Sequence, residues 1–383
     1  MPMEMRYPTL TDEDLEACRK VVGVELRNSS RISEATKDTI LMFARAIGSR
    51  NPVFQEETYA DKTFWGCLVA HPTFLYAVDN TIVAPGLPGI HTIYGGTDWE
   101  FFHPVRVGDS LYATRRLMDL QRKEGRFCGL MALQVGEVSY QNQHGYLVAR
   151  ATSHVLRTPR DAARDKGKYA HLGRYQYERE DFLGIMTDYD KEEIRGDRPR
   201  YWEETLDGEQ LPPIVRGPLS TEDMNHFVRT TIRMPMMAYF ADHLRRHPAD
   251  AYWDPALGMP DSWYASLLKD SVAREFGFPA AHDTGYQRIC WLENLITNWM
   301  GDLAFLKKLS VRLVGPNLHG DTTWCKGRVV SKHREGQDYL VTLEVWCENQ
   351  RGDITASGSA TVATVSRDPK SLPPLVDVPP RAE

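Results

Sequence analysis

Hydrophobic and polar residues alternate with two different periods along the chain, and each period occurs twice. The stretches 37–49 and 221–234 space their apolar residues as on one face of a helix. Stretches such as "YLVTLEVWC" (339–347) alternate apolar and polar residues, as strands with one buried face do. Turn-forming sequences, "REGQD" at 334–338 and "NQRGD" at 349–353, flank that stretch. The pattern therefore predicts helices followed by antiparallel strands, in two rounds.

The two rounds are copies of one another. Residues 102–157 and 312–365 each predict a three-stranded meander that follows a Gly-Asp turn. The matched positions are Gly108-Asp109 with Gly320-Asp321, Glu124-Gly125 with Glu335-Gly336, and Asn142-Gln143 with Asn349-Gln350. Internal repetition of this kind indicates two halves built on one plan.

A loop and a long apolar helix are expected before each meander. In the two loops, His71 and Thr73 match His282 and Thr284. Ser220 or Thr221 is the expected N-cap of the helix at 221–234. Each half thus reads helix, loop, long apolar helix and meander. This order predicts an α+β, double hot-dog fold, in which two antiparallel sheets are each wrapped around a long central helix.

Charge and periodicity also divide the chain into segments. Residues 158–199 are charged and poor in apolar periodicity, which predicts a surface linker. The N-terminal hot dog is expected at 1–157 and the C-terminal one at 200–370, followed by a tail at 371–383. The sequence "PRYWEETLDGEQLPP" (199–213) is expected to open the second half as an early strand and turn.

Composition and charge restrict the classes of function. The 383 residues are 42% hydrophobic and 26% charged, an ordinary soluble globular composition. The net charge of −6 argues against nucleic acid as the main partner, because a phosphate-binding surface needs a basic excess. Neither a membrane-spanning run nor the apolar core of a secretory signal is present, so we expect a cytoplasmic protein without a membrane partner. No two of the six cysteines have C-x-x-C spacing; we expect buried thiols and no metal.

Five short motifs occur in the same relative order as in one known family. They are "NPVF" (51–54), "YADKTFWGCLVAHPTF" (59–74), "VAREFGFPAAHDTG" (272–285), "TNWMGD" (297–302) and "LHGDT" (318–322). With them the chain resembles the MaoC-like, double hot-dog enoyl-CoA hydratases and acyl dehydratases over nearly its whole length except the linker and the termini. The resemblance implies hydration of 2-enoyl-CoA thioesters or dehydration of 3-hydroxyacyl-CoA thioesters. Coenzyme A is then part of the substrate, no separate cofactor is expected, and the protein should be a homo-oligomer or pair with another hot-dog chain.

In that family an Asp and a His flank an Asn-Pro and hold the reacting water between them. In the first half, Ser49 and Phe54 occupy these two positions around Asn51 and Pro52. Neither side chain can act as an acid or a base near neutral pH. We therefore expect the first half to be a non-catalytic domain that contributes to substrate binding.

The second half departs from the family pattern too. Direct alignment places Ile232 and Met237 at the Asp and His positions, and a second alignment places Leu268 at the His position. A long insertion at 240–263 contains Asp242 and His247, which have the spacing of the standard pair. A solvated loop or a lid is the alternative interpretation of that insertion.

The preferred catalytic candidates are His282 and Asp283 in "AAHDTG", together with Gly285. The resemblance implies that this loop runs into the N-terminus of the central helix, where backbone N–H groups can stabilise the enolate oxygen of a thioester. Two structural alternatives remain open. His282 could only brace the loop, as its counterpart His71 would do, and Asp283 could be a helix N-cap.

The candidate substrate-binding residues are Asn51, His71, Arg288, Trp291 and Trp299. Arg288 could meet a phosphate of coenzyme A or a carboxylate, or it could form a structural ion pair. The two tryptophans lie at helical spacing, so they either belong to the core or line an acyl pocket.

Two other functions remain open on the sequence alone. A hot-dog thioesterase would need a carboxylate on or near the central helix, for which Glu293 and Asp79 are the candidates. A non-catalytic subunit that pairs with an active hot-dog chain would explain directly why neither half has the Asp–His pair.

Overall fold

The computed structural model describes residues 8–27, 32–125, 129–160, 169, 171–232, 237–246, 251–254 and 257–368. The strands are β1 (Glu25–Leu26), β2 (His91–Phe101), β3 (Leu111–Gly125), β4 (Gly129–Asn142), β5 (Leu147–Thr158), β6 (Ile214–Arg216), β7 (Ala251–Asp254), β8 (Met259–Ser262), β9 (Phe305–Leu313), β10 (Thr323–Glu335), β11 (Asp338–Asn349) and β12 (Ile354–Thr364).

The α-helices are α1 (Asp12–Arg19), α2 (Lys37–Ala46), α3 (Glu57–Ala60), α4 (Leu75–Val78), α6 (Arg179–Asp190), α7 (Thr221–Thr231), α8 (Met237–Arg246), α9 (Asp270–Glu275) and α10 (Tyr286–Met300). The 3-10 helices are η1 (Pro52–Phe54), η2 (Pro72–Phe74), η3 (Trp202–Glu204) and η5 (Trp263–Leu267). Among the described helices, none combines the length and the apolar character that a membrane crossing requires.

Ten strands form one continuous sheet in the order β1-β3-β4-β5-β2-β9-β12-β11-β10-β6. The two predicted meanders are present as β3–β5 and β10–β12. Each meander has a further strand that the sequence pattern did not reveal, β2 in the first half and β9 in the second. These two strands pair with each other antiparallel and join the halves.

The central helices of the two halves differ in length. In the second half α10 has 15 residues, and every one of them is buried. In the first half the predicted long helix is wrong, because α4 has only four residues. The chain leaves the helix at Asp79, whose carboxylate accepts a hydrogen bond from the backbone N–H of Thr81 at 2.8 Å. Such a local side-chain contact competes with continued helical hydrogen bonding.

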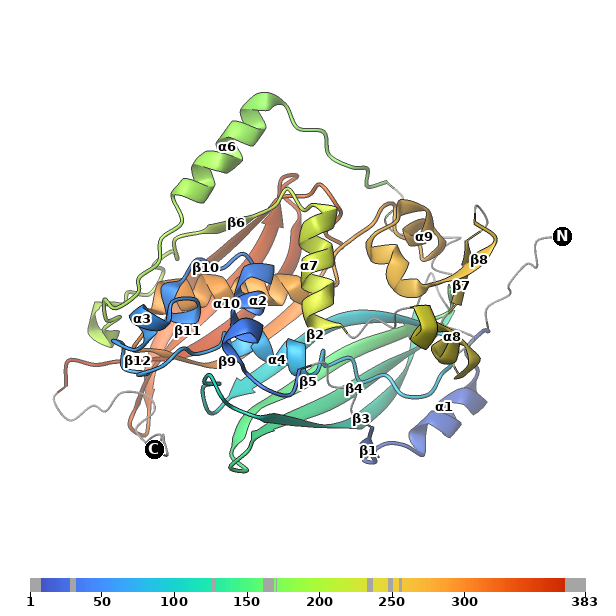
Figure 1. Ribbon diagram of the computed structural model, residues 1–383, viewed down its shortest axis with the longest axis horizontal. Helices are drawn as coiled ribbons and strands as arrows, with labels where there is room; N and C mark the ends of the chain where they lie inside the picture. The colour runs from blue at the N-terminus through green and yellow to red at the C-terminus, as the bar shows by residue number, and fades with distance from the viewer. Residues whose placement is uncertain are drawn as a thin grey trace.

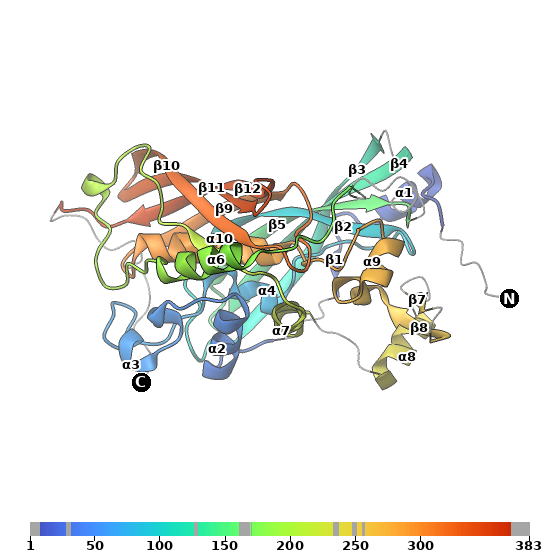
Figure 2. The ribbon, with the colours of Figure 1, turned by 90° about the horizontal axis from the view of Figure 1, so that it is seen from above.

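Helices α2, α4, α7 and α10 lie together on one face of the curved sheet (Figure 1, Figure 2). Figure 1 shows α10 across the strands of the second half, with α2, α4 and α7 beside it, and Figure 2 shows the same helices below the strands. The predicted helices at 37–49 and 221–234 correspond to α2 and α7. Ser220 is the N-cap of α7, as expected, and forms a capping box with Asp223. The early strand expected within 199–213 begins later, at Ile214, after η3.

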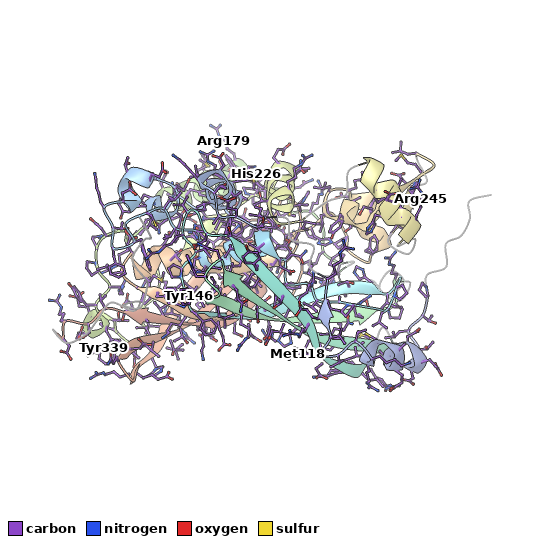
Figure 3. The ribbon with its side chains drawn as sticks, turned by 60° about the horizontal axis from the view of Figure 1, so that its bottom comes forward. Met118, Tyr146, Arg179, His226, Arg245 and Tyr339 are labelled. Atoms are coloured by element: carbon purple, nitrogen blue, oxygen red, sulfur yellow. The ribbon has the colours of Figure 1, made fainter. Side chains whose placement is uncertain are left out.

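The insertion of the second half is structured rather than a plain loop. It contains α8, the β7–β8 hairpin and η5. Figure 3 places Arg245 of α8 at one end of the molecule and Tyr339 of β11 at the opposite end. Asp242 is exposed and pairs with Arg245 one turn away, while His247 lies outside the described residues. The predicted tail at 371–383 also lies outside them.

The segment between the halves contains α6, a helix that the sequence pattern did not predict. Just beyond α6, the carboxylate of Glu192 is buried between elements of both halves. It pairs with the buried guanidinium of Arg216 at 3.2 Å and with the exposed Arg50 at 3.0 Å. It also accepts a hydrogen bond from Asn298 of α10 at 3.1 Å. This cluster ties the interdomain segment to the first half and to the central helix.

We expect Glu192→Ala to lower the free energy of unfolding by about 3–5 kcal/mol, because it leaves the buried charge of Arg216 without its carboxylate. Arg50→Ala is the matched control. It removes a partner of the same carboxylate from an exposed position and should cost less than about 1 kcal/mol. Urea unfolding of the full chain measures both values. Equal losses for the two variants would contradict this account of the cluster.

Candidate functional site

The main pocket has a volume of about 580 Å³ and lies between the two halves. This volume is within the range of small-molecule sites. One wall comes from the second half and contains the loop before α10 and the first residue of that helix, from His282 to Tyr286. The opposite wall comes from the first half, from β2, β4, β5 and the loop before β2. The apolar residues of that wall include Ile82, Ile93, Met131 and Leu156.

His282 has the geometry of a base. Its Nδ1 lies 2.7 Å from the backbone carbonyl oxygen of Asp283. A carbonyl only accepts hydrogen bonds, so Nδ1 carries the proton and Nε2 carries the free lone pair. Nε2 is buried and has no hydrogen-bond partner among the described residues. The ring of Phe278 packs against the imidazole with its centroid 3.9 Å away and holds its orientation.

The surroundings of His282 keep it neutral. Burial lowers the pKa of its imidazole below the usual value. Asp283 raises this pKa through the backbone hydrogen bond and its charge, whereas Arg288 and His319 lower it again. Because burial is the largest effect, the net direction is downward. A neutral imidazole is the form that can accept a proton at physiological pH.

Asp283 is held in an ion pair. Arg288 donates to its two carboxylate oxygens, at 2.7 and 3.2 Å, and both side chains are buried. Arg288 also donates to the carbonyl oxygens of Gly315 at 2.8 Å and Thr355 at 2.5 Å. The pair therefore braces the loop against β9 and β12. Both residues line the pocket, and the structural ion pair is the alternative that the sequence had left open for Arg288.

The loop enters α10 through Gly285, which is the N-cap; Asp283 does not take that role. Gly285 has φ +79°, and a Cβ at this position would lie 2.5 Å from Cδ1 of Leu313. The first N–H groups of a helix have no acceptor within it and carry the positive end of the helix dipole. Thr284, Gly285 and Tyr286 line the pocket here, and Oγ1 of Thr284 is buried without a partner in the described part of the chain.

The equivalent position of the first half is nearly filled. A second pocket of only about 50 Å³ lies there, lined by Phe54, Leu75, Phe101 and Phe305 among others. Phe54 also packs on the imidazole of His71, with 3.7 Å between ring centroids. The side chain at the family's His position therefore covers the histidine that corresponds to His282. This filling agrees with the expected non-catalytic first half.

His71 lies outside both pockets. Its Nδ1 is 3.1 Å from both carboxylate oxygens of Glu293 on α10, and Thr73 donates to the same carboxylate at 2.7 Å. The side chains of His71 and Glu293 are fully buried. This contact joins the loop of the first half to the central helix of the second. It is a bracing role, which the sequence analysis had considered for such a histidine.

Three further predicted substrate-binding residues lie away from the main pocket. Asn51 lines the small pocket and caps η1 by accepting from Val53. Trp291 is buried in the core, and Trp299 donates from its indole to Glu209 at 3.3 Å. Apolar residues on a fully buried helix point in all directions, so helical spacing could not show which ones reach a pocket.

Several residues that line the main pocket were not among the candidates. Ile232, aligned with the family's Asp, is one of them and puts an apolar side chain at that position. Met237 begins α8, and its side chain lies outside the described residues. His91, Tyr94 and Thr158 come from the first half. Only the pairing of β2 with β9 brings them to the site, so the linear sequence carries no sign of them.

Comparison with known proteins finds similarity to dehydratases and hydratases. The family model described as "FAS1-like, dehydratase domain region" matches residues 20–151. A 3-hydroxybutyryl-CoA dehydratase of Methylorubrum extorquens is 30% identical over 76 residues, which is 20% of this chain and 48% of the relative. An (R)-specific enoyl-CoA hydratase of Rhodospirillum rubrum is 29% identical over 90 residues, 24% of this chain and 62% of the relative. The chain thus spans about half of the first relative and less than two thirds of the second.

A third relative is matched over more of its length. A UPF0336 protein of Parafrankia sp. is 30% identical over 123 residues, which is 30% of this chain and 78% of that protein. Solved structures extend the likeness of fold to both halves. A MaoC-like dehydratase has a TM-score of 0.64 at 14% identity and covers 92% of this chain and all of its own.

A conserved hypothetical protein of Mycobacterium tuberculosis, described as a double hot-dog fold, has a TM-score of 0.52 at 11% identity. The match covers 88% of this chain and 94% of that one. The continuous sheet, the duplicated order of elements and these matches confirm the predicted fold. The chain belongs to the family of MaoC-like, double hot-dog dehydratases and hydratases.

Proposed function

We propose that this protein adds water to 2-enoyl-CoA thioesters, or removes it from 3-hydroxyacyl-CoA thioesters, in the pocket beside His282. The observation that carries the proposal is the free, buried Nε2 of His282 beside the N-terminus of α10. A base and a positive helix end are the two groups that the reaction needs. The names of the dehydratase and hydratase relatives support the same substrate class.

In the hydration direction, Nε2 of His282 accepts a proton from water as the water oxygen bonds to Cβ. The π electrons of the double bond move to the thioester, whose oxygen becomes negative. The N–H groups at Gly285 and Tyr286 are placed to stabilise that charge. The imidazolium of His282 then gives the proton to Cα and returns to its neutral form. Dehydration is the same sequence of steps in reverse.

In this mechanism Asp283 and Arg288 are positioning residues. Their ion pair holds the loop, so neither is asked to transfer a proton. The apolar residues of the first-half wall provide room for the acyl chain. Coenzyme A is part of the substrate, and no further cofactor enters any step. Assembly into a homo-oligomer, or with another hot-dog chain, stays a prediction.

A thioesterase mechanism has less support from the described residues. Glu293 is fully buried and engaged by His71 and Thr73. Asp79 is buried against Arg115, at 3.3 Å, and also accepts from the backbone of Thr81. Neither carboxylate lines either of the two pockets, so neither is placed to hold a water against a thioester carbon.

The reaction class is tested with crotonyl-CoA and a longer enoyl-CoA. We expect the absorbance of the conjugated double bond to fall without release of free thiol. Appearance of free thiol would instead establish a thioesterase. No change with any acyl-CoA would favour the non-catalytic subunit.

The role of His282 is tested by His282→Gln. We expect kcat to fall at least about 10²-fold, the usual range for losing a proton-transfer group. His71→Gln is the matched control, since His71 is the equivalent residue of the first half but faces no pocket; its hydratase activity should stay within about threefold. Unchanged hydration by His282→Gln would refute the assignment.

The pH dependence of the wild-type reaction follows from the lowered pKa of His282. The base must be neutral, so activity is lost only as pH falls through a value below the usual histidine pKa near 6.5. We expect kcat to be level through neutral pH and to show its acidic limb below about pH 6.5. An acidic limb centred above pH 7 would mean that another group titrates.

The helix N-terminus is tested by Gly285→Ala. A side chain at φ +79° is strained, and its Cβ would also displace Leu313 and the backbone beside the thioester. Gly320→Ala, at φ +89° with open space around it, isolates the cost of the backbone conformation. Both should lower stability by about 1–2 kcal/mol, whereas Gly285→Ala alone should reduce kcat by about 10-fold or more.

A further inference from the structure

One polar patch interrupts the apolar first-half wall of the main pocket. His91 is the first residue of β2, and it is paired across the strands with Thr158, the last residue of β5. Both side chains line the pocket. His91 is 9% exposed, and Oγ1 of Thr158 is buried without a partner in the part of the chain that the structure describes. A purely apolar acyl chain would leave these groups without hydrogen bonds.

The ring of His91 is held in place by packing. Phe276 lies against it with 5.3 Å between centroids and an interplanar angle of 30°. The guanidinium of Arg160 lies over the same phenyl ring, 5.2 Å from its centroid. Within the described residues, no side chain or backbone group forms a hydrogen bond with the ring nitrogens of His91. The nitrogens therefore remain for a ligand in the pocket.

His91 also stays uncharged. Burial lowers its pKa to about 3, and electrostatic interactions with Arg160, His282 and Arg157 act in the same direction. A neutral imidazole has one N–H donor and one acceptor nitrogen. His91 and His282 both line the main pocket, His91 from the first half and His282 from the second. Because His91 is neutral, it does not oppose proton uptake by His282 through charge repulsion.

We propose that His91 binds the oxygen on C3 of the substrate, as a binding group contributed by the first half to the site of the second. This inference rests on the proposed function. In the hydration direction a ring N–H of His91 donates to the oxygen of the attacking water, while His282 accepts the proton of that water. The new C–O bond then leaves the hydroxyl of the product on the same donor. The proton balance is that of His282 alone, and His91 ends each cycle unchanged.

A residue with a merely structural role would not distinguish ligands with an oxygen on C3 from ligands without one. An enoyl thioester has no oxygen on C3, whereas the 3-hydroxyacyl thioester has one. Loss of His91 should therefore leave the binding of unsubstituted acyl chains unchanged and weaken only the binding of the hydroxylated ligand. One hydrogen bond of ordinary strength corresponds to about threefold to tenfold in Kd.

Calorimetry with six ligands tests this on the full chain. The ligands are butyryl-CoA and octanoyl-CoA with their 3-hydroxy derivatives, each enantiomer measured separately. Wild type should bind one 3-hydroxy enantiomer about threefold to tenfold more tightly than the unsubstituted chain. His91→Phe should lose this preference but keep the Kd for the unsubstituted chain within about threefold. His91→Gln, which retains a donor, should keep part of it, and Thr158→Val controls for the neighbouring hydroxyl.

Each result decides the inference. Absence of any 3-hydroxy preference in wild type, or its survival in His91→Phe, would overturn the role of His91; its loss only in Thr158→Val would move the role to Thr158. The protein could also show a 3-hydroxy preference that His91→Phe removes and yet hydrate no enoyl-CoA. That result would support the binding role of His91 and refute the proposed reaction. Where hydration occurs, His91→Phe should lower kcat by about tenfold with little change in KM for crotonyl-CoA. Melting temperatures close to that of wild type exclude misfolding as the cause.

Discussion

The antiparallel pairing of β2 with β9 is the contact on which the rest of the structure depends. Five residue pairs, from Gly96 with Arg312 to Glu100 with Lys308, make two half-sheets into one. This pairing joins the two halves, while α10 packs against the strands of the second half (Figure 1). It also sets the loop before α10 opposite the start of β2. The main pocket exists because of that juxtaposition, since each half supplies one wall.

The two halves have diverged at equivalent places. Both have a histidine before the central helix, and in both the centroid of an aromatic ring lies within 4 Å of that of the imidazole. In the first half that ring is Phe54, the adjoining pocket is about 50 Å³, and His71 turns to the carboxylate of Glu293. In the second half the pocket is open, and Nε2 of His282 is free among the described residues. The filled pocket of the first half makes that half a structural support, while the pocket of the second half has room for a substrate.

Sequence reasoning reached the fold because duplication repeats each signal. The Gly-Asp turns, the meanders and the loop histidines appear twice, so an ambiguous pattern in one half is supported by the other. The same reasoning failed at α4, where the expected helix ends after four residues. There the apolar pattern continues past Val78, but the local contact of Asp79 with Thr81 ends the helix, and periodicity alone does not include such contacts. Strands β2 and β9 were missed because burial along both departs from strict alternation, which was the signal used for strands.

Some residues of the candidate site could likewise be found from the sequence, and others could not. His282, Asp283, Gly285 and Arg288 are neighbours in the chain and lie together at the pocket, so a local motif was enough to find them. Trp291 and Trp299 were grouped with them by helical spacing. Such spacing shows which residues share a face of the helix, but not which other elements pack against that face. His91 is 191 positions away from His282 in numbering, and the two line one pocket only because β2 pairs with β9. No local motif could have included it.

The absence of the family's Asp from this wall has an electrostatic consequence. An ionised carboxylate beside a histidine raises its pKa and favours the imidazolium. Here Ile232 occupies the aligned position, and the carboxylate of Asp283 is neutralised by Arg288. Burial can therefore dominate and keep His282 neutral. In the family pattern a charged Asp would orient the reacting water. Within the described part of this chain His282 has no such partner, so an uncharged group must orient the water. The opposite wall, which belongs to the other half, offers such a group in His91.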